Sequence, residues 1–367
     1  INVTGTYAAT AFTVTNNGNG TSNITLNNNQ LITGTSGNDN LPGGSGNDTI
    51  NGLEGNDYII AGGDGASDTV DGGDGNDIYS NSFFSQTGAV TFTSTGPSGT
   101  QVDPTGGTDT ISNVEEFHIF GGSGSDTLTG DSGRNWIQGN GGDDTLTGGG
   151  GNDSFGFDVS KANGTDRIND LTTGENLAFQ RPGGALFSLA GPVLAGNDAS
   201  GLTAGQVMVG TPSGGVTRIH VGTDGTAGAD LTVDLQGSFT ASDFSVVNDA
   251  FGGNLVYVPG QVITGTGVNE TLSGAQGNDT IDGQGGSDNI NGNGGDDSLL
   301  GGDGDDYLSG GAGNDSIDGG LGNDWIFHDG ATSAVTVNLG TGSVTGGAGN
   351  DTVAGIEYVG GSAHDDS

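Results

Sequence analysis

The sequence has no cysteine, 7 proline residues and only 5 lysine or arginine residues among its 367 positions. No disulfide can therefore stabilise the chain, which suits a reducing compartment or an extracellular protein held together by another device. No run of 18 apolar residues exists that could form a transmembrane helix. The chain starts at Ile1 without the basic and apolar segments of a signal peptide. We therefore expect no membrane insertion.

Positive charge is the scarcest property of the chain. Against its 5 basic residues stand 45 aspartates and glutamates, so the formal net charge is -40. Such a charge repels phosphate backbones and anionic bilayers, which excludes nucleic-acid binding as a function. Residues 219–367 contain no lysine or arginine at all. The carboxylates of that segment cannot be neutralised by the side chains around them.

Apolar residues are also few, at 30%, whereas glycine occurs 80 times. This composition alone would indicate disorder. Glycine shows no strict triplet period and proline is rare, so collagen is excluded. The glycines instead recur in a regular pattern, which argues against a flexible linker.

That pattern is a nonapeptide, G-G-x-G-x-D-x-U-x, in which U is apolar. It occupies three blocks, residues 34–80, 121–156 and 265–327, and gives sixteen copies in total. The eighth position is apolar or aromatic in every copy, and the sixth is aspartate in fourteen of the sixteen. A low-complexity segment would not keep two positions in phase over this length.

The nonapeptide resembles that of the RTX (repeat-in-toxin, haemolysin-type) calcium-binding proteins. The resemblance implies a parallel β-roll. In each copy x-U-x would be a short strand with U pointing inward, while glycines make the preceding turn and two copies complete one coil. We expect an all-β chain with little or no helix, in which β-roll segments alternate with small β-rich modules.

The sixth-position aspartates are the candidate metal ligands. Stacked strands bring these carboxylates close together, where they repel each other unless a cation lies between them. Ca2+ suits the site because it takes six to eight oxygen ligands, whereas Mg2+ prefers a tighter octahedron and Zn2+ is offered no His/Cys cluster. The predicted side-chain ligands are Asp39, Asp48, Asp57, Asp68, Asp77, Asp126, Asp144, Asp153, Asp279, Asp288, Asp297, Asp306, Asp315, Asp324 and Asp366.

Two copies depart from the pattern at the sixth position, with Asn135 and Glu270 in place of aspartate. We expect weaker, capping or vacant sites there. Pro42 and the two-residue insertion around Ala66 should interrupt the strands of the first block. If each ion lies between turns n and n+2, the three blocks hold three, two and five ions, or roughly ten.

The segments between the blocks are not repetitive. Asp109-Thr110-Ile111 matches Asp351-Thr352-Val353, so residues 81–120 and 328–360 form two similar β modules. Residues 157–264 resemble the β-rich module that follows RTX arrays in many type I secreted proteins. The predicted organisation is a β-rich lead-in at 1–33, array 1 at 34–80, a β module at 81–120, array 2 at 121–156, the post-array-like module at 157–264, array 3 at 265–327, a β module at 328–360 and an incomplete repeat at 361–367.

The incomplete repeat ends at Ser367 without its last two positions, which Ile1 and Asn2 would supply. One hypothesis is that copies associate head-to-tail, Ser367 end to Ile1 end, or that a longer tandem chain continues there. The alternative is an arbitrary boundary.

No catalytic motif accompanies the four scattered histidines, so we predict that the chain is not an enzyme. Trp136 and Trp325 are interpreted as strand-packing residues rather than sugar-binding platforms. The preferred function is an extracellular or cell-surface, calcium-dependent structural protein exported by bacterial type I secretion, as a filament, surface layer or adhesin stalk. The alternatives are the accessory RTX portion of a secreted enzyme or toxin and a calcium-buffering or secretion-assisting module.

Overall fold

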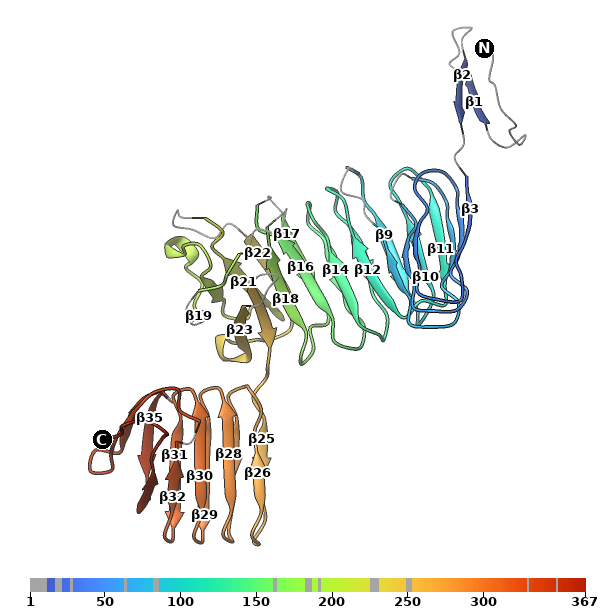
Figure 1. The fold of residues 1–367 in the computed structure, drawn as a ribbon. Helices are drawn as coiled ribbons and strands as arrows, with labels where there is room; N and C mark the ends of the chain where they lie inside the picture. Colours follow the sequence, from blue (N-terminus) through green and yellow to red (C-terminus); the bar gives the residue numbers. More distant parts are fainter. Residues whose placement is uncertain are drawn as a thin grey trace. The chain divides into compact units, whose positions relative to one another are not determined.

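The computed structural model describes residues 12–16, 22–26, 29–62, 65–81, 86–160, 164–181, 187–190, 193–224, 231–248, 253–328, 330–347 and 349–367. These residues form strands and two short 3₁₀ turns, Ala199–Gly201 and Ala241–Asp243, with no α-helix among them. The strands stack as successive coils of a solenoid (Figure 1). The predicted all-β, parallel β-roll fold is confirmed.

The chain divides into two compact units. The first comprises Ile1–Pro192, Gly196–Ser238 and Asn248–Asn254, and the second comprises Val193–Ala195, Phe239–Val247 and Leu255–Ser367. The strands up to the post-array-like module are β1 (Phe12–Asn16), β2 (Ser22–Leu26), β3 (Leu31–Thr33), β4 (Asn40–Pro42), β5 (Thr49–Asn51), β6 (Tyr58–Ile60), β7 (Thr69–Asp71), β8 (Ile78–Ser80), β9 (Thr91–Ser94), β10 (Gly99–Val102), β11 (Thr108–Ser112), β12 (Glu116–Phe120), β13 (Thr127–Thr129), β14 (Asn135–Gln138), β15 (Thr145–Thr147) and β16 (Ser154–Asp158).

The remaining strands complete the two units. The first unit also contains β17 (Thr165–Ile168), β18 (Asn176–Gln180), β20 (Val207–Val209), β21 (Val216–Val221) and β22 (Leu231–Gln236). The second unit contains β19 (Leu194–Ala195), and the boundary between the units crosses β23 (Phe244–Asn248) and β24 (Gly253–Tyr257). The second unit continues with β25 (Val262–Thr264), β26 (Thr271–Ser273), β27 (Thr280–Asp282), β28 (Asn289–Gly294), β29 (Ser298–Asp303), β30 (Tyr307–Ala312), β31 (Ser316–Leu321), β32 (Trp325–Phe327), β33 (Val335–Asn338), β34 (Ser343–Gly346), β35 (Gly349–Ala354) and β36 (Tyr358–Gly360).

Each array forms two facing sheets, because alternate nonapeptides pair in parallel. In the second unit β25, β27, β29, β31 and β35 form the parallel part of one sheet, which β34 and β33 extend, and β26, β28, β30, β32 and β36 form the other. The register is two nonapeptides, so Ile281 pairs with Leu299 and Ile290 with Leu308. One coil therefore contains two copies, as the sequence predicts.

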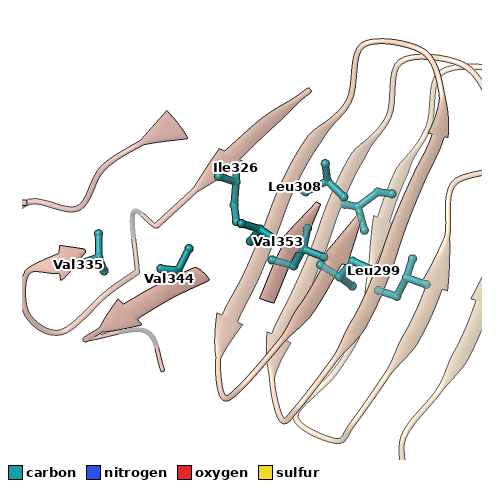
Figure 2. Close-up of a cluster of buried hydrophobic side chains, with 9 residues drawn as sticks. Leu299, Leu308, Ile326, Val335, Val344 and Val353 are labelled. Atoms are coloured by element: carbon teal, nitrogen blue, oxygen red, sulfur yellow. The ribbon is translucent and has the colours of Figure 1, made fainter. Parts of the chain in front are cut away.

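The eighth-position side chains fill the space between the sheets. Fifteen of the sixteen are buried, and Leu272 in the first coil of the second unit is half-buried. Figure 2 shows this core in the second unit, where Leu299, Leu308 and Ile326 lie beside Val353 of the following module. Burial of one apolar side chain per strand contributes about 1.5–3 kcal/mol for each of these residues.

The two similar modules continue the coils with a hairpin inserted. In the first, β9, β10 and β11 are antiparallel neighbours, and β11 then pairs in parallel with β7. In the second, β33, β34 and β35 repeat this order and β35 pairs with β31. Ile111 thus lies opposite Val70, and Val353 opposite Ile317, at eighth-position sites.

The expected interruption of strands in the first array is wrong. Pro42 lies in β4 and pairs in register with Ile60. Strand β4 is the edge of its sheet, where a missing N–H need not interrupt the ladder. The insertion is accommodated in the turn before β7, because Ile50 still pairs with Val70 although they are twenty residues apart. Part of that turn lies outside the described residues.

Candidate calcium-binding turns

The sixth-position carboxylates form a row along each edge of the roll. In array 3, one oxygen of Asp306 accepts the backbone N–H of Asp288 at 2.8 Å, and one oxygen of Asp324 accepts that of Asp306 at 2.8 Å. Asp77 accepts the N–H of Asp57 at 2.8 Å across the longer coil of array 1. Each carboxylate therefore links two successive coils through a charge-assisted hydrogen bond.

The second carboxylate oxygen divides the turns into two kinds. In the turns that we call open, Oδ2 is buried and has no hydrogen-bond partner among the described residues. The open turns are those of Asp57, Asp77, Asp144, Asp153, Asp288, Asp297, Asp306, Asp315 and Asp324. A buried polar atom without a partner is costly, so each open turn calls for a donor or a cation.

In the turns that we call closed, the same oxygen accepts the backbone N–H of the second repeat position. Thr35 donates to Asp39 at 2.6 Å, Gly122 to Asp126 at 2.7 Å and Ala275 to Asp279 at 2.6 Å. Glu270 and Asp366 are closed in the same way by Thr266 and Ser362. Closed turns stand at the beginning of each array and in the incomplete repeat.

Backbone conformation at the second position distinguishes the two kinds. Every open turn has a positive φ there, and the residues concerned are Leu53, Gly73, Asn140, Gly149, Gln284, Asn293, Gly302, Gly311 and Gly320. In this left-handed conformation the backbone N–H of the second residue does not donate to the sixth-position carboxylate. Leu53, with φ 80°, adopts it despite the steric cost to a residue with a Cβ.

Burial and neighbouring carboxylates both disfavour the charged form of these aspartates. Burial, the larger cause, and the negative charges of Asp315 and Asp279 raise the pKa of Asp297 to about 7. The pKa of Asp315 is raised to about 6, again mainly by burial. Burial likewise raises the pKa of Asp144, which faces Asp166 one coil further on. A cation in the row would remove this penalty.

The open turns fit Ca2+ only if backbone oxygens also take part. No group of three or more His, Cys, Asp or Glu side chains gathers around one point in the described part of the chain. At Gly301, however, a Cβ would collide with both Asp306 Oδ2 and the carbonyl oxygen of Gly319 in the next coil. Glycine thus leaves room beside one carboxylate oxygen and one carbonyl oxygen, the hard donors that Ca2+ prefers.

Asn135 supplies its own hydrogen-bond donors where aspartate would need a cation. Its amide nitrogen donates to Gly133 O at 3.0 Å and to Asp153 Oδ1 at 3.2 Å. Among the predicted ligands outside the open set, Asp48 and Asp68 are buried and lie in the row, since Asp48 Oδ1 accepts the N–H of Gln30 at 2.7 Å and Asp68 Oδ1 accepts that of Asp48 at 2.7 Å.

Sequence reasoning missed several carboxylates that extend the rows. Asp109 and Asp351 accept the N–H of Asp68 and Asp315, at 2.9 and 3.0 Å. A signal was present, because D-T-I and D-T-V in the two modules match D-x-U of the repeat. Two glutamates, Glu115 and Glu357, take the same role in the other row, where they accept the N–H of Asp77 and Asp324 at 2.8 and 2.9 Å, and nothing in their spacing marks them.

A parallel β-roll with rows of buried carboxylates belongs to the class of cation-binding repeat solenoids. The family model of the RTX calcium-binding nonapeptide repeat (4 copies) matches residues 33–65, 120–155, 264–299, 300–330 and 338–355. The chain therefore carries RTX repeats, which bind Ca2+. The last matched range includes Asp351 of the module at 328–360, although that stretch lacks the full nonapeptide.

Other comparisons add little. No curated protein matches the chain. Among solved structures, the extracellular lipase LipA of Serratia marcescens is 17% identical with a TM-score of 0.21, over 57% of this chain and 38% of the lipase chain. The match thus spans well under half of the lipase. The described residues contain no helix long and apolar enough to cross a membrane.

Proposed function

We propose that the chain is an extracellular structural protein that Ca2+ folds and rigidifies, and that it forms or extends a filament, surface layer or adhesin stalk. The observation that carries the proposal is that the second position is left-handed in each of the nine turns whose buried carboxylate oxygen has no hydrogen-bond partner among the described residues. These turns have the form of cation sites, and they make up much of the roll.

Ca2+ would supply positive charge between coils that the chain itself lacks. Asp297, Asp306 and Asp315 would hold it through Oδ2, while their Oδ1 atoms keep the coils in register by accepting backbone N–H groups. Without the ion the like charges repel and the coils separate. Millimolar external Ca2+ then favours the folded state, and low cytosolic Ca2+ keeps the chain unfolded for export through a type I system.

The proposed number of ions remains roughly ten. Array 2 has two open turns, at Asp144 and Asp153, and array 3 has five. These equal the numbers expected from one ion between turns n and n+2, whereas array 1 has two open turns, at Asp57 and Asp77, for the three ions expected. Isothermal titration of the calcium-free chain measures the stoichiometry directly.

The test of the whole proposal is removal of the metal. Far-ultraviolet circular dichroism and small-angle scattering of the full chain in excess EGTA should show loss of strand signal and a several-fold expansion. Return of Ca2+, but not of Mg2+ at the same concentration, should restore both. A compact, strand-rich chain in EGTA at neutral pH would disprove calcium-coupled folding.

We also propose that copies associate, or a longer chain continues, by stacking one further coil on β33. Ser367 N donates to Val335 O at 3.1 Å and Ser367 O accepts from Val337 N at 2.8 Å. The parallel pairing of β13 with β9 starts with the same kind of bond, since Thr127 N donates to Val90 O at 2.9 Å. The partner end at Ile1 lies outside the described residues.

Electron microscopy and sedimentation of the calcium-loaded chain test this association. Val337→Pro removes the N–H that Ser367 O accepts where the further coil would begin, and should shorten or abolish assemblies, whereas Thr336→Ala keeps that N–H and should not. Monodisperse monomers at every concentration would contradict head-to-tail association, and unchanged assemblies in V337P would contradict the role of β33.

A further inference from the structure

The outer face of one sheet in the second unit carries an arrangement that metal binding does not use. This sheet consists of β26, β28, β30, β32 and β36. Parallel pairing aligns its outward side chains in two rows across the strands. The first row is Thr271, Asn289, Tyr307, Trp325 and Tyr358, and the second is Ser273, Asn291, Ser309, Phe327 and Gly360.

Four aromatic rings gather at one end of these rows. Trp325 stacks on Tyr358 with ring centroids 4.6 Å apart and on Tyr307 at 6.4 Å, with interplanar angles of 17° and 11°. Phe327 lies 5.8 Å from Trp325 at 10° and 5.9 Å from Tyr307 at 16°. Tyr307 and Tyr358 remain 47% and 44% exposed, so this aromatic surface meets solvent.

Polar side chains adjoin the rings in a groove of about 580 Å³. Asn289, Asn291 and Ser309 line it together with Tyr307 and Phe327. Asn293 also lines the groove and is held by hydrogen bonds from its amide to Ser273 Oγ and Gly274 O, both at 2.9 Å. Among the described residues that line the groove there is no carboxylate, and His328 is the only basic side chain.

The roll itself does not require these residues. The outward rows of the opposite sheet carry Thr280, Ser298, Ser316 and Thr352 in one line and Asp282, Leu300, Asp318 and Ala354 in the other, with no aromatic ring at any of these positions. Both sheets bury the same kinds of eighth-position residues. The aromatic and amide rows are therefore a property of one face rather than of the nonapeptide.

We propose that this face binds neutral polysaccharides built of pyranose rings. The C–H groups on one face of such a ring carry partial positive charge and pack on the negative face of an aromatic ring. Trp325 is stacked between Tyr307 and Tyr358, so the faces on offer are those of the two tyrosines turned away from Trp325. Its hydroxyl groups pair with amides such as those of Asn289 and Asn291, each of which can both donate and accept. A chain of net charge -40 repels acidic polymers, and the described residues that line the groove include no carboxylate to pair with a cationic one, which favours an uncharged ligand. Trp325 remains a strand-packing residue in this proposal, and it positions the two tyrosine rings that stack on it.

The experiment is affinity electrophoresis of the full calcium-loaded chain in native gels containing hydroxyethylcellulose, glucomannan, xyloglucan or dextran, with alginate as the acidic comparison. At least one neutral polymer should retard the chain. Trp325→Ala and Asn289→Ala should each weaken that retardation by about tenfold. Trp136→Ala, in the other unit, and Leu300→Ala, on the opposite sheet, should leave it unchanged.

Asn289→Ala keeps the proposal testable if Trp325→Ala unfolds, because Asn289 takes no part in the aromatic stack. Its circular dichroism spectrum and calcium stoichiometry should be those of the parent chain, which separates failure of this site from failure of calcium-coupled folding. Retardation by none of the neutral polymers, retardation by alginate alone, or equal retardation of the parent and N289A would overturn the proposal.

Discussion

The modules that follow arrays 1 and 3 have the same backbone but different outer faces. Glu115 accepts the N–H of Asp77 at 2.8 Å, and Glu357 accepts that of Asp324 at 2.9 Å. One residue further on, Glu116 lies opposite Ile78 in the first unit, whereas Tyr358 lies opposite Trp325 in the second. The two modules thus share the residue types at the turn positions that join the coils, while the outward positions of the same strands differ.

Metal removal should have the largest effect and should distinguish the two units. The chain has two tryptophans, and Trp136 lies in the first unit and Trp325 in the second. In Trp136→Phe and Trp325→Phe variants the remaining fluorophore reports one unit. We expect the second unit to unfold in EGTA in a steeper transition, because its five open turns are consecutive. Superimposable transitions for the two variants would show that the arrays do not respond separately.

Substitution of single aspartates should separate open from closed turns. Asp306→Ala should lower calcium affinity at least about tenfold and reduce stability by about 3 kcal/mol, because it removes a proposed ligand and the acceptor that joins two coils. Asp126→Ala, in a closed turn, should cost only about 1–2 kcal/mol. Thermal unfolding at saturating Ca2+ and calcium titration measure both. Asn135→Ala serves as the control that should leave stoichiometry unchanged.

Acid should partly replace calcium. The folded-state pKa values of Asp297 and Asp315 are raised to about 7 and about 6, above the 3.8 of an unperturbed aspartate. Between these limits the folded state binds more protons than the unfolded state, so the stability of the metal-free fold falls as pH rises from about 4 to about 7. Acidifying the EGTA-treated chain from pH 8 to pH 5 should therefore restore strand signal in circular dichroism.

The same shifts predict weaker apparent calcium affinity at pH 5.5 than at pH 8, since protons and Ca2+ compete for the carboxylates. Affinity that is independent of pH over this range would mean that these aspartates are not ligands.

Exchanging the outward residues should have the smallest effect on folding. Tyr358→Glu places in the second unit the residue type that Glu116 provides at the equivalent position of the first. It should reduce the free energy of unfolding by about 0.5–1.5 kcal/mol through loss of stacking on Trp325. The reverse change, Glu116→Tyr, adds no stacking because Ile78 offers no ring, and it removes only the half-exposed contact of Glu116 with His118 at 2.7 Å, about 0.2–1 kcal/mol. Thermal unfolding of the two variants compares them, and a larger loss in E116Y than in Y358E would contradict the assignment.

Much of the fold could be predicted because the repeat is periodic. Inward residues such as Ile290 and Leu308 and ladder residues such as Asp297 recur every nine positions, so register and row follow from counting. Glu357 escaped prediction because it lies at a different spacing and reaches the row only through a longer side chain. Pro42 was misjudged because its place at a sheet edge is a property of the stacked coils.

The sequence alone thus determined the charge deficit, the two-copy coil, the inward core and the aspartate row, since each depends on residue type at a fixed period. Only the tertiary structure decided which turns are open. The second position is Leu53 in one open turn and Gly122 in a closed one, so residue type does not settle its φ. The place of the turn in its array correlates with that conformation instead, because closed turns stand where an array begins and in the incomplete repeat. The aromatic surface likewise arises only when strands eighteen or more residues apart lie side by side.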